Sequence, residues 1–366
     1  MIFCGLVIGN GPGHAQTADP GLDIPKIPRW DMVTSLRAAG GFKDNVLLSH
    51  DRRQSSPFLL GGGDLALSRL PLDGWQVNLL LLGEDTRYFQ SPSVHHEDTA
   101  FAQGQIKRDF GQDWTAALSG EYTYLDRVLD ASITEVDLRS VKVRGHTAAA
   151  TPSVRRDFSG DFWLEVQVSA TRQEFDQPLD GYWEGGPKIL LGHNVGAQTE
   201  LTLSFEPSRR FYDTREQATA AGLSIPRSHL EYELRRTQFA ARHFLDQAQH
   251  WRAVTRLGFE EVRDNASGYF SFDKLFFSGQ LRFKDRNWEL KAQGKISHYF
   301  YPGQKASASS PELRRRTDFI ATLRAERPLA GHWKLFAEDE FNRVLSNETV
   351  EAYRVNSAMA GLEIEF

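Results

Sequence analysis

A short unit recurs along this chain: a polar turn, then a tryptophan, then a stretch of alternating apolar and polar side chains. Six of the eight tryptophans follow such a turn, at intervals of roughly forty residues. One interval, from Trp163 to Trp251, is about twice as long. The turn expected in its middle is the segment Gly196 to Glu200, which has no tryptophan. Each interval has room for two strands, a short turn and a longer loop, so we predict a series of β-hairpins. The six tryptophans are Trp75, Trp114, Trp163, Trp251, Trp288 and Trp333.

The residues after Trp288 show the alternation clearly. One face is almost entirely apolar, with Leu290, Ala292, Gly294, Ile296 and Phe300, and the other is polar, with Glu289, Lys291, Gln293, Lys295 and Ser297. Side chains of a strand point to opposite faces with period two, so such a strand has one apolar and one polar face. The stretches run about ten to fifteen residues, whereas strands in soluble sheets usually have five or six. A tilted membrane-spanning strand needs about nine to eleven.

Counting the hairpins predicts an all-β fold, a transmembrane antiparallel up-and-down β-barrel of about sixteen strands over residues 30–366. An even number closes the sheet without an exposed edge. Fourteen or eighteen strands also fit, because Pro152 weakens the stretch 143–157 and the stretch 183–196 is poorly defined. Seven tight turns are expected near residues 72, 111, 160, 198, 248, 286 and 330. Eight longer loops are expected near 49–57, 89–97, 130–143, 175–188, 212–228, 262–270, 302–314 and 346–352.

Two other classes of protein compete with the barrel. A helical membrane protein is excluded, because no apolar run of eighteen residues occurs and the mean hydropathy is -0.46. A soluble sandwich or propeller, with the tryptophans as core anchors, explains the alternation but not the strand length.

The N-terminus has features of an export signal. Residues 2–9 are apolar, and two small-x-small triplets follow, which predicts a signal peptide over residues 1–18. No Lys or Arg precedes residue 26, which predicts either a signal truncated at its start or an atypical signal. Residues 19–29 would form a short periplasmic segment. The only cysteine, Cys4, lies in the predicted signal, so the mature chain would have neither a cysteine zinc site nor a cysteine nucleophile.

The two ends of the predicted barrel resemble known barrels. From Tyr353 the chain alternates to a terminal Phe366, like the last strand of bacterial outer-membrane barrels, whose closing phenylalanine is read by the barrel assembly machinery. The segment from Gly40 to Asn45 is similar to the Gly-aromatic-x-Asp-Asn opening of several outer-membrane barrel families, including the barrel of surface lipoprotein assembly modifiers. The resemblance implies a location in the cell outer membrane. It also implies the assembly machinery, membrane lipid and lipopolysaccharide as partners, and no nucleic acid.

The two faces of the strands predict two sets of site residues. The six tryptophans are expected at the membrane interface, because amphipathic rings prefer the headgroup zone. The polar face is expected to line a pore, and enrichment of Lys and Arg on 251–260, 278–284 and 288–301 favours anions. Alternatively, these charges pair across strands and only hold the barrel round. The pore-lining candidates are Lys291, Lys295, Arg252, Arg256, Arg282, Lys284, Glu289 and Glu121.

No catalytic residue, metal ion or cofactor is assigned. The histidines show no Ser–His or Asp–His pattern. His95 to Asp98 carry metal-capable side chains, but adjacent ligands rarely converge without partners from elsewhere. Arginine clusters near strand ends are expected to be solvated or to contact lipopolysaccharide phosphates. These clusters are 155–156, 209–210, 235–236 and 314–316.

The function expected from these patterns is an outer-membrane pore for small hydrophilic solutes. About sixteen strands enclose a lumen wide enough for water unless a segment plugs it. Loop 130–143 or loop 212–228 is long enough to fold inward and narrow that lumen, and the sequence does not say which one does. The alternatives are a barrel that exports or assembles a polysaccharide or surface protein, and an outer-membrane enzyme. The oligomeric state stays open.

Overall fold

The computed structural model describes residues 29–366 except 72, 134–139, 159–160 and 308–309. The predicted signal peptide, 1–18, and all of the segment 19–29 except Arg29 lie outside the described residues. No helix in the described part of the chain is long and apolar enough to cross a membrane.

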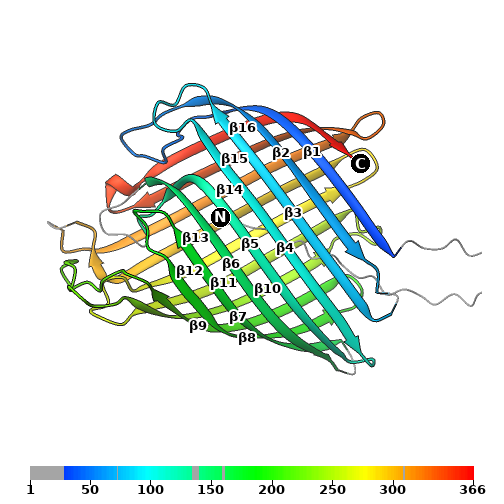
Figure 1. The fold of residues 1–366 in the computed structure, drawn as a ribbon, viewed down its shortest axis with the longest axis horizontal. Helices are drawn as coiled ribbons and strands as arrows, with labels where there is room; N and C mark the ends of the chain where they lie inside the picture. Colours follow the sequence, from blue (N-terminus) through cyan, green and yellow to red (C-terminus); the bar gives the residue numbers. More distant parts are fainter. Residues whose placement is uncertain (1–28, 72, 134–139, 159–160, 308–309) are drawn as a thin grey trace, which may run out of the picture.

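Sixteen strands form one closed barrel (Figure 1). Every strand pairs antiparallel with its neighbours in sequence, and β1 pairs with β16 to close the ring. The predicted sixteen-stranded up-and-down barrel is therefore confirmed. The strands are β1 (Trp30–Lys43), β2 (Ser56–Arg69), β3 (Trp75–Tyr88), β4 (His96–Phe110), β5 (Trp114–Asp130), β6 (Ser140–Asp157), β7 (Phe162–Phe175), β8 (Tyr182–Val195), β9 (Thr199–Tyr212), β10 (Glu231–Phe244), β11 (Trp251–Asp264), β12 (Phe272–Lys284), β13 (Glu289–Lys305), β14 (Leu313–Pro328), β15 (Trp333–Ser346) and β16 (Tyr353–Glu365), with a short 3₁₀ helix η1 (Thr349–Glu351) before β16.

The two ends of the barrel differ in their connections. Seven short turns join the strands at one end, which we call the turn end, where β1 also begins and β16 finishes. Eight longer connections lie at the opposite loop end, on the left in Figure 1. Four of the turns use a glycine with positive φ, a conformation that costs glycine little: Gly74, Gly111, Gly196 and Gly331. Each predicted turn falls between two strands that meet at the turn end, and each predicted loop falls between two strands that meet at the loop end.

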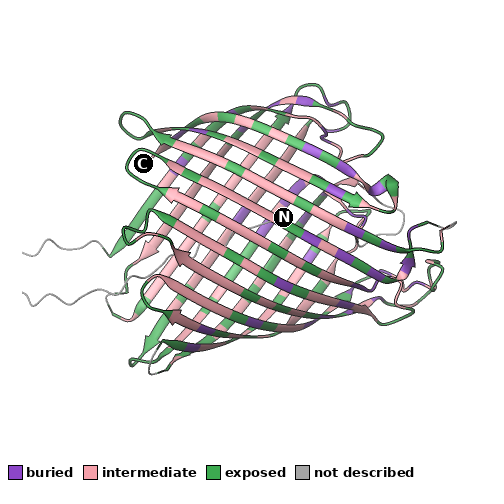
Figure 2. Ribbon diagram, turned by 180° about the vertical axis from the view of Figure 1, so that it is seen from behind, coloured by how far each residue is buried: buried purple, intermediate pink, exposed green. Residues whose placement is uncertain are grey.

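The outer face of the barrel is an apolar band. Leu257, Phe259, Leu275 and Phe277 on the neighbouring strands β11 and β12 are each close to half exposed, although they are large and apolar. Figure 2 shows such exposed positions alternating with less exposed ones along the strands. A closed barrel with an apolar exterior is suited to lipid, because its strands pair with one another around the ring and no sheet edge is exposed. The fold is that of an outer-membrane protein.

Prolines interrupt two strands without ending them. β6 has 18 residues, although its pairing with β7 skips Thr151 and Pro152. The pairing of β8 with β9 likewise skips the three residues between Gly185 and Ile189, which include Pro187. Proline lacks the amide donor that the ladder needs, so a local gap is expected. The two stretches that were weakest in sequence are thus complete strands.

Buried residues gather towards the loop end (Figure 2). One cluster lies on the β9–β13 wall and includes Tyr232, Leu234 and Tyr301. A second cluster lies around β1–β3 and includes Val46 from loop 44–55 and Val94 from loop 89–95. The loops therefore contribute to a packed interior at one end of the barrel.

Candidate functional site

The candidate site is the interior of the barrel, and one loop reaches across it. We call residues 131–133, the described residues that follow β5, the inward loop. Arg316 on β14 donates to Asp130 at 2.7 Å and to the Ser132 hydroxyl at 2.5 Å, and Arg314 donates to the Ser132 carbonyl at 2.7 Å. Because β5 and β14 are nearly half the ring apart, these bonds cross the lumen.

The anchor of the inward loop is buried and highly charged. Arg314 and Arg316 expose only 4% and 2% of their side chains. Arg314 also binds Glu351 at 2.6 Å, and Arg316 binds Asp318 at 2.6 Å. Removing one partner from a buried ion pair typically costs about 3–5 kcal/mol, because the other charge is left uncompensated. We call this set of contacts the latch.

Residues close to the latch in the chain make further apolar and polar contacts. Ile133 packs against the buried cluster on the β9–β13 wall. The Ser140 hydroxyl, at the start of β6, donates to the Leu48 carbonyl of loop 44–55 at 2.8 Å. The described residues 130–133 of loop 130–143 therefore reach across the barrel interior. Loop 212–228 contributes Ala218 to the same wall cluster.

Beneath the inward loop lies a cavity of about 570 Å³. Its lining carries both signs of charge and comes from widely separated strands. Cationic residues in the lining are Arg127, Lys274, Lys295 and Arg316, and anionic ones are Glu84, Asp130, Asp318 and Glu340. A polar, charged cavity between apolar outer walls is what a water-filled path through a barrel requires.

Four of the predicted pore-lining residues form one ion-pair cluster near the turn end. Glu289 forms ion pairs with Arg282 at 2.9 Å and with Lys291 at 2.9 Å, and Lys284 lies 3.7 Å away. Lys291 also lies 3.6 Å from Glu326 on β14. The alternative prediction, that charges pair across strands, describes this cluster well. Arg252 lies beside it, since it is in register with Arg282.

Three other predicted residues have no ion pair with any described residue: Arg256, Lys295 and Glu121. Arg256 on β11 and Lys295 on β13 line one recess of about 340 Å³ in the barrel wall. Glu121 lies on the opposite wall, since β5 and β13 are half the ring apart. Among these three residues, the two cations therefore lie on one wall and the carboxylate lies on the other.

Five of the six predicted interface tryptophans lie on the outer surface at the turn end. Their exposed fractions lie between 37% and 46% in Trp75, Trp114, Trp251, Trp288 and Trp333. Their contact with lipid headgroups stays a prediction. Phe366 is also exposed and its amide donates to the Thr34 carbonyl of β1 at 2.8 Å, which extends the closure of the ring. Recognition of Phe366 by the assembly machinery stays a prediction too.

The prediction for Trp163 was wrong. Its side chain is 5% exposed and lies inside the barrel, with the Arg155 guanidinium 4.3 Å from the ring centroid. The neighbouring Phe162, which is 49% exposed, takes the outer position. A shift of one residue exchanges the two faces of a strand, and two aromatic residues in a row leave the choice open. Gly192 on β8 decides it, because it leaves space for the indole.

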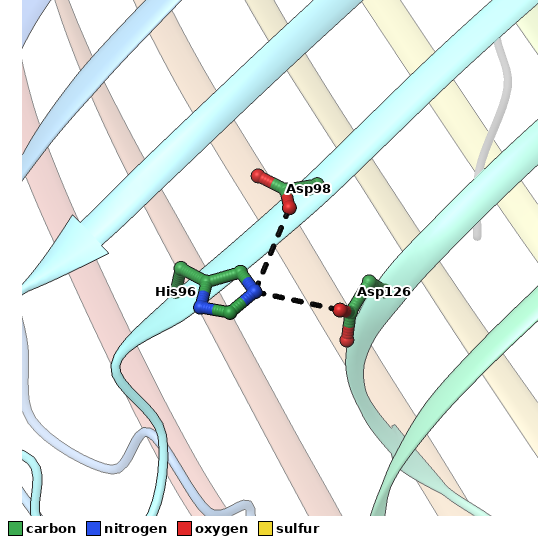
Figure 3. A group of neighbouring side chains, drawn as sticks. All are labelled: His96, Asp98 and Asp126. Carbon is green, nitrogen blue, oxygen red and sulfur yellow. Dashed lines mark ion pairs between the residues drawn. The ribbon is translucent and has the colours of Figure 1, made fainter.

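The segment His95 to Asp98 is divided between the two faces of β4. Glu97 points inward, where Lys43 lies 3.3 Å away and Tyr88 donates to it at 2.6 Å. Figure 3 shows His96 between Asp98 and Asp126, with its Nε2 atom 3.7 Å and 3.5 Å from their carboxylate oxygens. Asp126 on β5 is distant from His96 in the chain, so the sequence could not show that the two side chains meet.

These three side chains have the donor atoms of a metal site, since their ligand atoms lie within 4.8 Å of one another. Asp126, however, already pairs with Lys142 at 3.1 Å and with Arg144 at 3.3 Å. A metal ion would have to compete with two cations for this carboxylate. The group is an ion-pair network at the loop end, and we assign no metal to it.

The predicted arginine clusters are also divided by strand alternation. Arg209 and Arg235 are exposed and both lie near Glu233, whereas Arg210 and Arg236 both bind the half-buried Glu184. In the cluster 314–316, the first and last residues, Arg314 and Arg316, belong to the latch. The expectation of solvated ends was wrong for Arg314 and Arg316. Contact of the exposed arginines with lipopolysaccharide stays a prediction.

Several solved outer-membrane barrels have a similar fold, although no protein-family model matches the chain and no curated protein matches it in sequence. OccAB3 of Acinetobacter baumannii is similar, with 9% identity over 92% of this chain and 99% of that one and a TM-score of 0.49. An anion-selective porin from Comamonas acidovorans shares 10% identity over 92% and 99% of the two chains, with a TM-score of 0.45.

The copper transporter OprC is a third similar structure. It shares 12% identity over 88% of this chain, with a TM-score of 0.46. The chain spans only 62% of the length of OprC.

Proposed function

We propose that the protein is a passive outer-membrane channel for small hydrophilic solutes, with a preference for anions. The observation that carries this proposal is the lumen itself: a closed ring of sixteen strands with a charged cavity beside the inward loop. Sixteen strands enclose more space than their own side chains fill. A loop held across that space sets the size of the solutes that pass.

The preference for anions rests on the charged lumen side chains that have no ion-pair partner among the described residues. Salt-bridged charges in the lumen, such as Arg282 with Glu289, largely cancel at the distance of a passing ion. Arg256 and Lys295 have no such partner among the described residues and lie together on one wall, whereas Glu121 lies on the far wall and Glu340 lies on β15. Two unpaired cations on one wall favour anions in a pore.

The proposal is tested by refolding the mature chain and recording currents in a planar bilayer with a KCl gradient. We expect stable single-channel steps and a reversal potential displaced towards that of chloride. A barrel that shifts its mobility on heating, and so is folded, but carries no current would contradict the channel. A reversal potential displaced towards that of potassium would contradict the anion preference.

The two alternative functions meet different obstacles. Export of a polymer would require the latch to open, because bonds from Asp130 and Ser132 to Arg316 cross the lumen. A hydrolase of the Ser–His–Asp type would need a histidine positioned between a serine and a carboxylate. The group at His96 brings two aspartates instead, and two cations already hold Asp126.

A further inference from the structure

We infer that the wall recess between β10 and β14 is a binding subsite for small oxyanionic solutes, meaning those with a carboxylate or phosphate group. This inference rests on the proposed channel function and deepens it from charge preference to saturable binding. The recess has a volume of about 340 Å³, which suits a small organic acid. Its polar lining is Gln238, Arg256, Ser278, Gln280, Gln293 and Lys295.

Strand register places the two cations side by side. Arg256 on β11 is in register with Ser278 on β12, and Ser278 is in register with Lys295 on β13. Their backbones are therefore two strand spacings apart, about 10 Å. Both side chains are long enough to reach one solute between them. A guanidinium offers a planar fork for an oxyanion, and an ammonium adds a mobile point charge.

The surrounding charges do not cancel these two cations. Four ionisable groups lie close to the recess: Glu260, Lys274, Asp318 and Arg316. Glu260 already binds Lys274 at 3.3 Å and Arg236 at 3.1 Å, and Asp318 already binds Arg316 at 2.6 Å. The carboxylates that could neutralise Arg256 or Lys295 are thus engaged elsewhere. The recess keeps a local positive charge that an anionic solute can compensate.

The uncharged lining gives the recess its shape and hydrogen-bonding capacity. Gln280 and Gln293 are in register on neighbouring strands, and Gln238 adds a third amide from β10. The Phe276 ring lies against Gly258, where an added Cβ would come within 2.3 Å of the ring. Glycine at this position therefore lets the ring lie against the wall. Amides can both donate and accept, so they suit a solute with a polar group besides its anionic one.

The test measures binding directly, without relying on current. Isothermal titration calorimetry on the refolded full chain in detergent at low ionic strength uses succinate and, separately, inorganic phosphate as probes. We expect saturable binding of at least one probe. Arg256→Gln and Lys295→Gln should each raise its Kd about tenfold, because each removes a charge-assisted hydrogen bond.

The matched control is Lys291→Gln. Lys291 is on the same strand and face as Lys295, but it is paired with Glu289. This variant also removes one lumen cation, so a general effect of charge would appear in it equally. We expect its Kd to stay within about twofold of the original. Heat-dependent mobility shows that each variant is folded.

The outcomes separate the inference from the channel proposal. Binding of succinate alone identifies organic acids as the ligands, binding of phosphate alone identifies phosphates, and both support an oxyanion site. Absence of saturable binding by either probe overturns the subsite, as does an equal loss of affinity in Lys291→Gln. A folded barrel that binds the probe but carries no current keeps the subsite and rejects the channel. A folded barrel that conducts but binds neither probe keeps the channel proposal and rejects the subsite.

Discussion

At the residue scale, the face of a side chain follows from its position in the strand. Period-two alternation correctly placed most residues, because each strand is long and each turn is short. It was wrong at Trp163, where the pattern does not say which of two adjacent aromatic residues faces lipid. The deciding residue, Gly192, lies on the next strand, in register with Trp163. Local sequence cannot show such a contact.

The first prediction tests that contact. Gly192→Ala should destabilise the barrel by about 1–3 kcal/mol, because the new Cβ would lie 1.9 Å from the Trp163 indole. Urea unfolding in lipid vesicles, followed by tryptophan fluorescence, measures the change. Gly83→Ala is the control, since a Cβ there meets no atom within 4 Å. Equal stability of the two variants would show that Trp163 adapts freely.

A second prediction at this scale concerns the turn between β2 and β3. Arg69 binds Asp73 through two hydrogen bonds of 2.6 Å and 2.9 Å and lowers the pKa of that carboxyl from 3.8 to about 2. A depressed pKa in the folded state means that ionised Asp73 stabilises the turn above about pH 4 and that this contribution is lost as the pH falls towards 2.

Arg69→Gln should therefore return the pKa of Asp73 towards 3.8. A carboxyl ¹³C NMR titration of the refolded protein measures it. An unchanged, low pKa in the variant would mean that the backbone amide of Trp75, which donates to Asp73 at 3.4 Å, is sufficient to hold the charge.

At the scale of the elements, the positions of the strands could be predicted from the sequence, whereas the paths of the loops could not. Strand ends are marked by turn residues such as Gly111 and Gly196 in the sequence itself. The inward loop carries no comparable mark. Its path depends on Asp130 and Ser132 meeting Arg316 across the lumen, and Asp130 is 186 positions away from that arginine in the chain.

The third prediction tests the latch as an element. Asp130→Asn removes the carboxylate that anchors the end of β5 to Arg316, so the inward loop should move away from the pore axis more often. We expect a larger single-channel conductance, by about twofold or more, with more current noise, because a buried pair has lost one partner.

The control for the latch is Asp126→Asn. Asp126 is on the same strand but belongs to the outward group with His96, so its loss should leave conductance unchanged. Equal conductance of the original protein and Asp130→Asn would show that the latch does not limit the path.

At the scale of the whole molecule, closure of the ring gives the barrel its lumen. β1 and β16 are joined by the register pairs from Ser35 with Glu365 to Lys43 with Ser357, and Phe366 adds a further backbone hydrogen bond to Thr34. The closure is short compared with the pairing of β1 and β2, which extends from Trp30 to Lys43. The first and last strands must meet before every backbone group is paired.

The fourth prediction concerns this closure. Deletion of Phe366 should lower the amount of barrel in the outer membrane of cells severalfold, if the terminal aromatic is the assembly signal. Refolding of the same variant in detergent should still give a heat-modifiable barrel, because the remaining pairs of β1 with β16 are intact. Quantitative blotting of membrane fractions and gel mobility measure the two effects. Normal amounts in cells would contradict the assembly role.

The sequence by itself determined the barrel class, the positions of the turns and loops along the chain and the outward direction of every interface tryptophan except Trp163, and it limited the strand number to about sixteen. These features are local: alternation and turn chemistry act between residues that are close in the chain. Only the tertiary structure decided which loop enters the lumen and which lumen charges stay unpaired. Arg256, Lys295 and Arg282 look alike in sequence, but only Arg282 has a carboxylate within reach. Closing the ring brings distant residues together, and that proximity selects the partners.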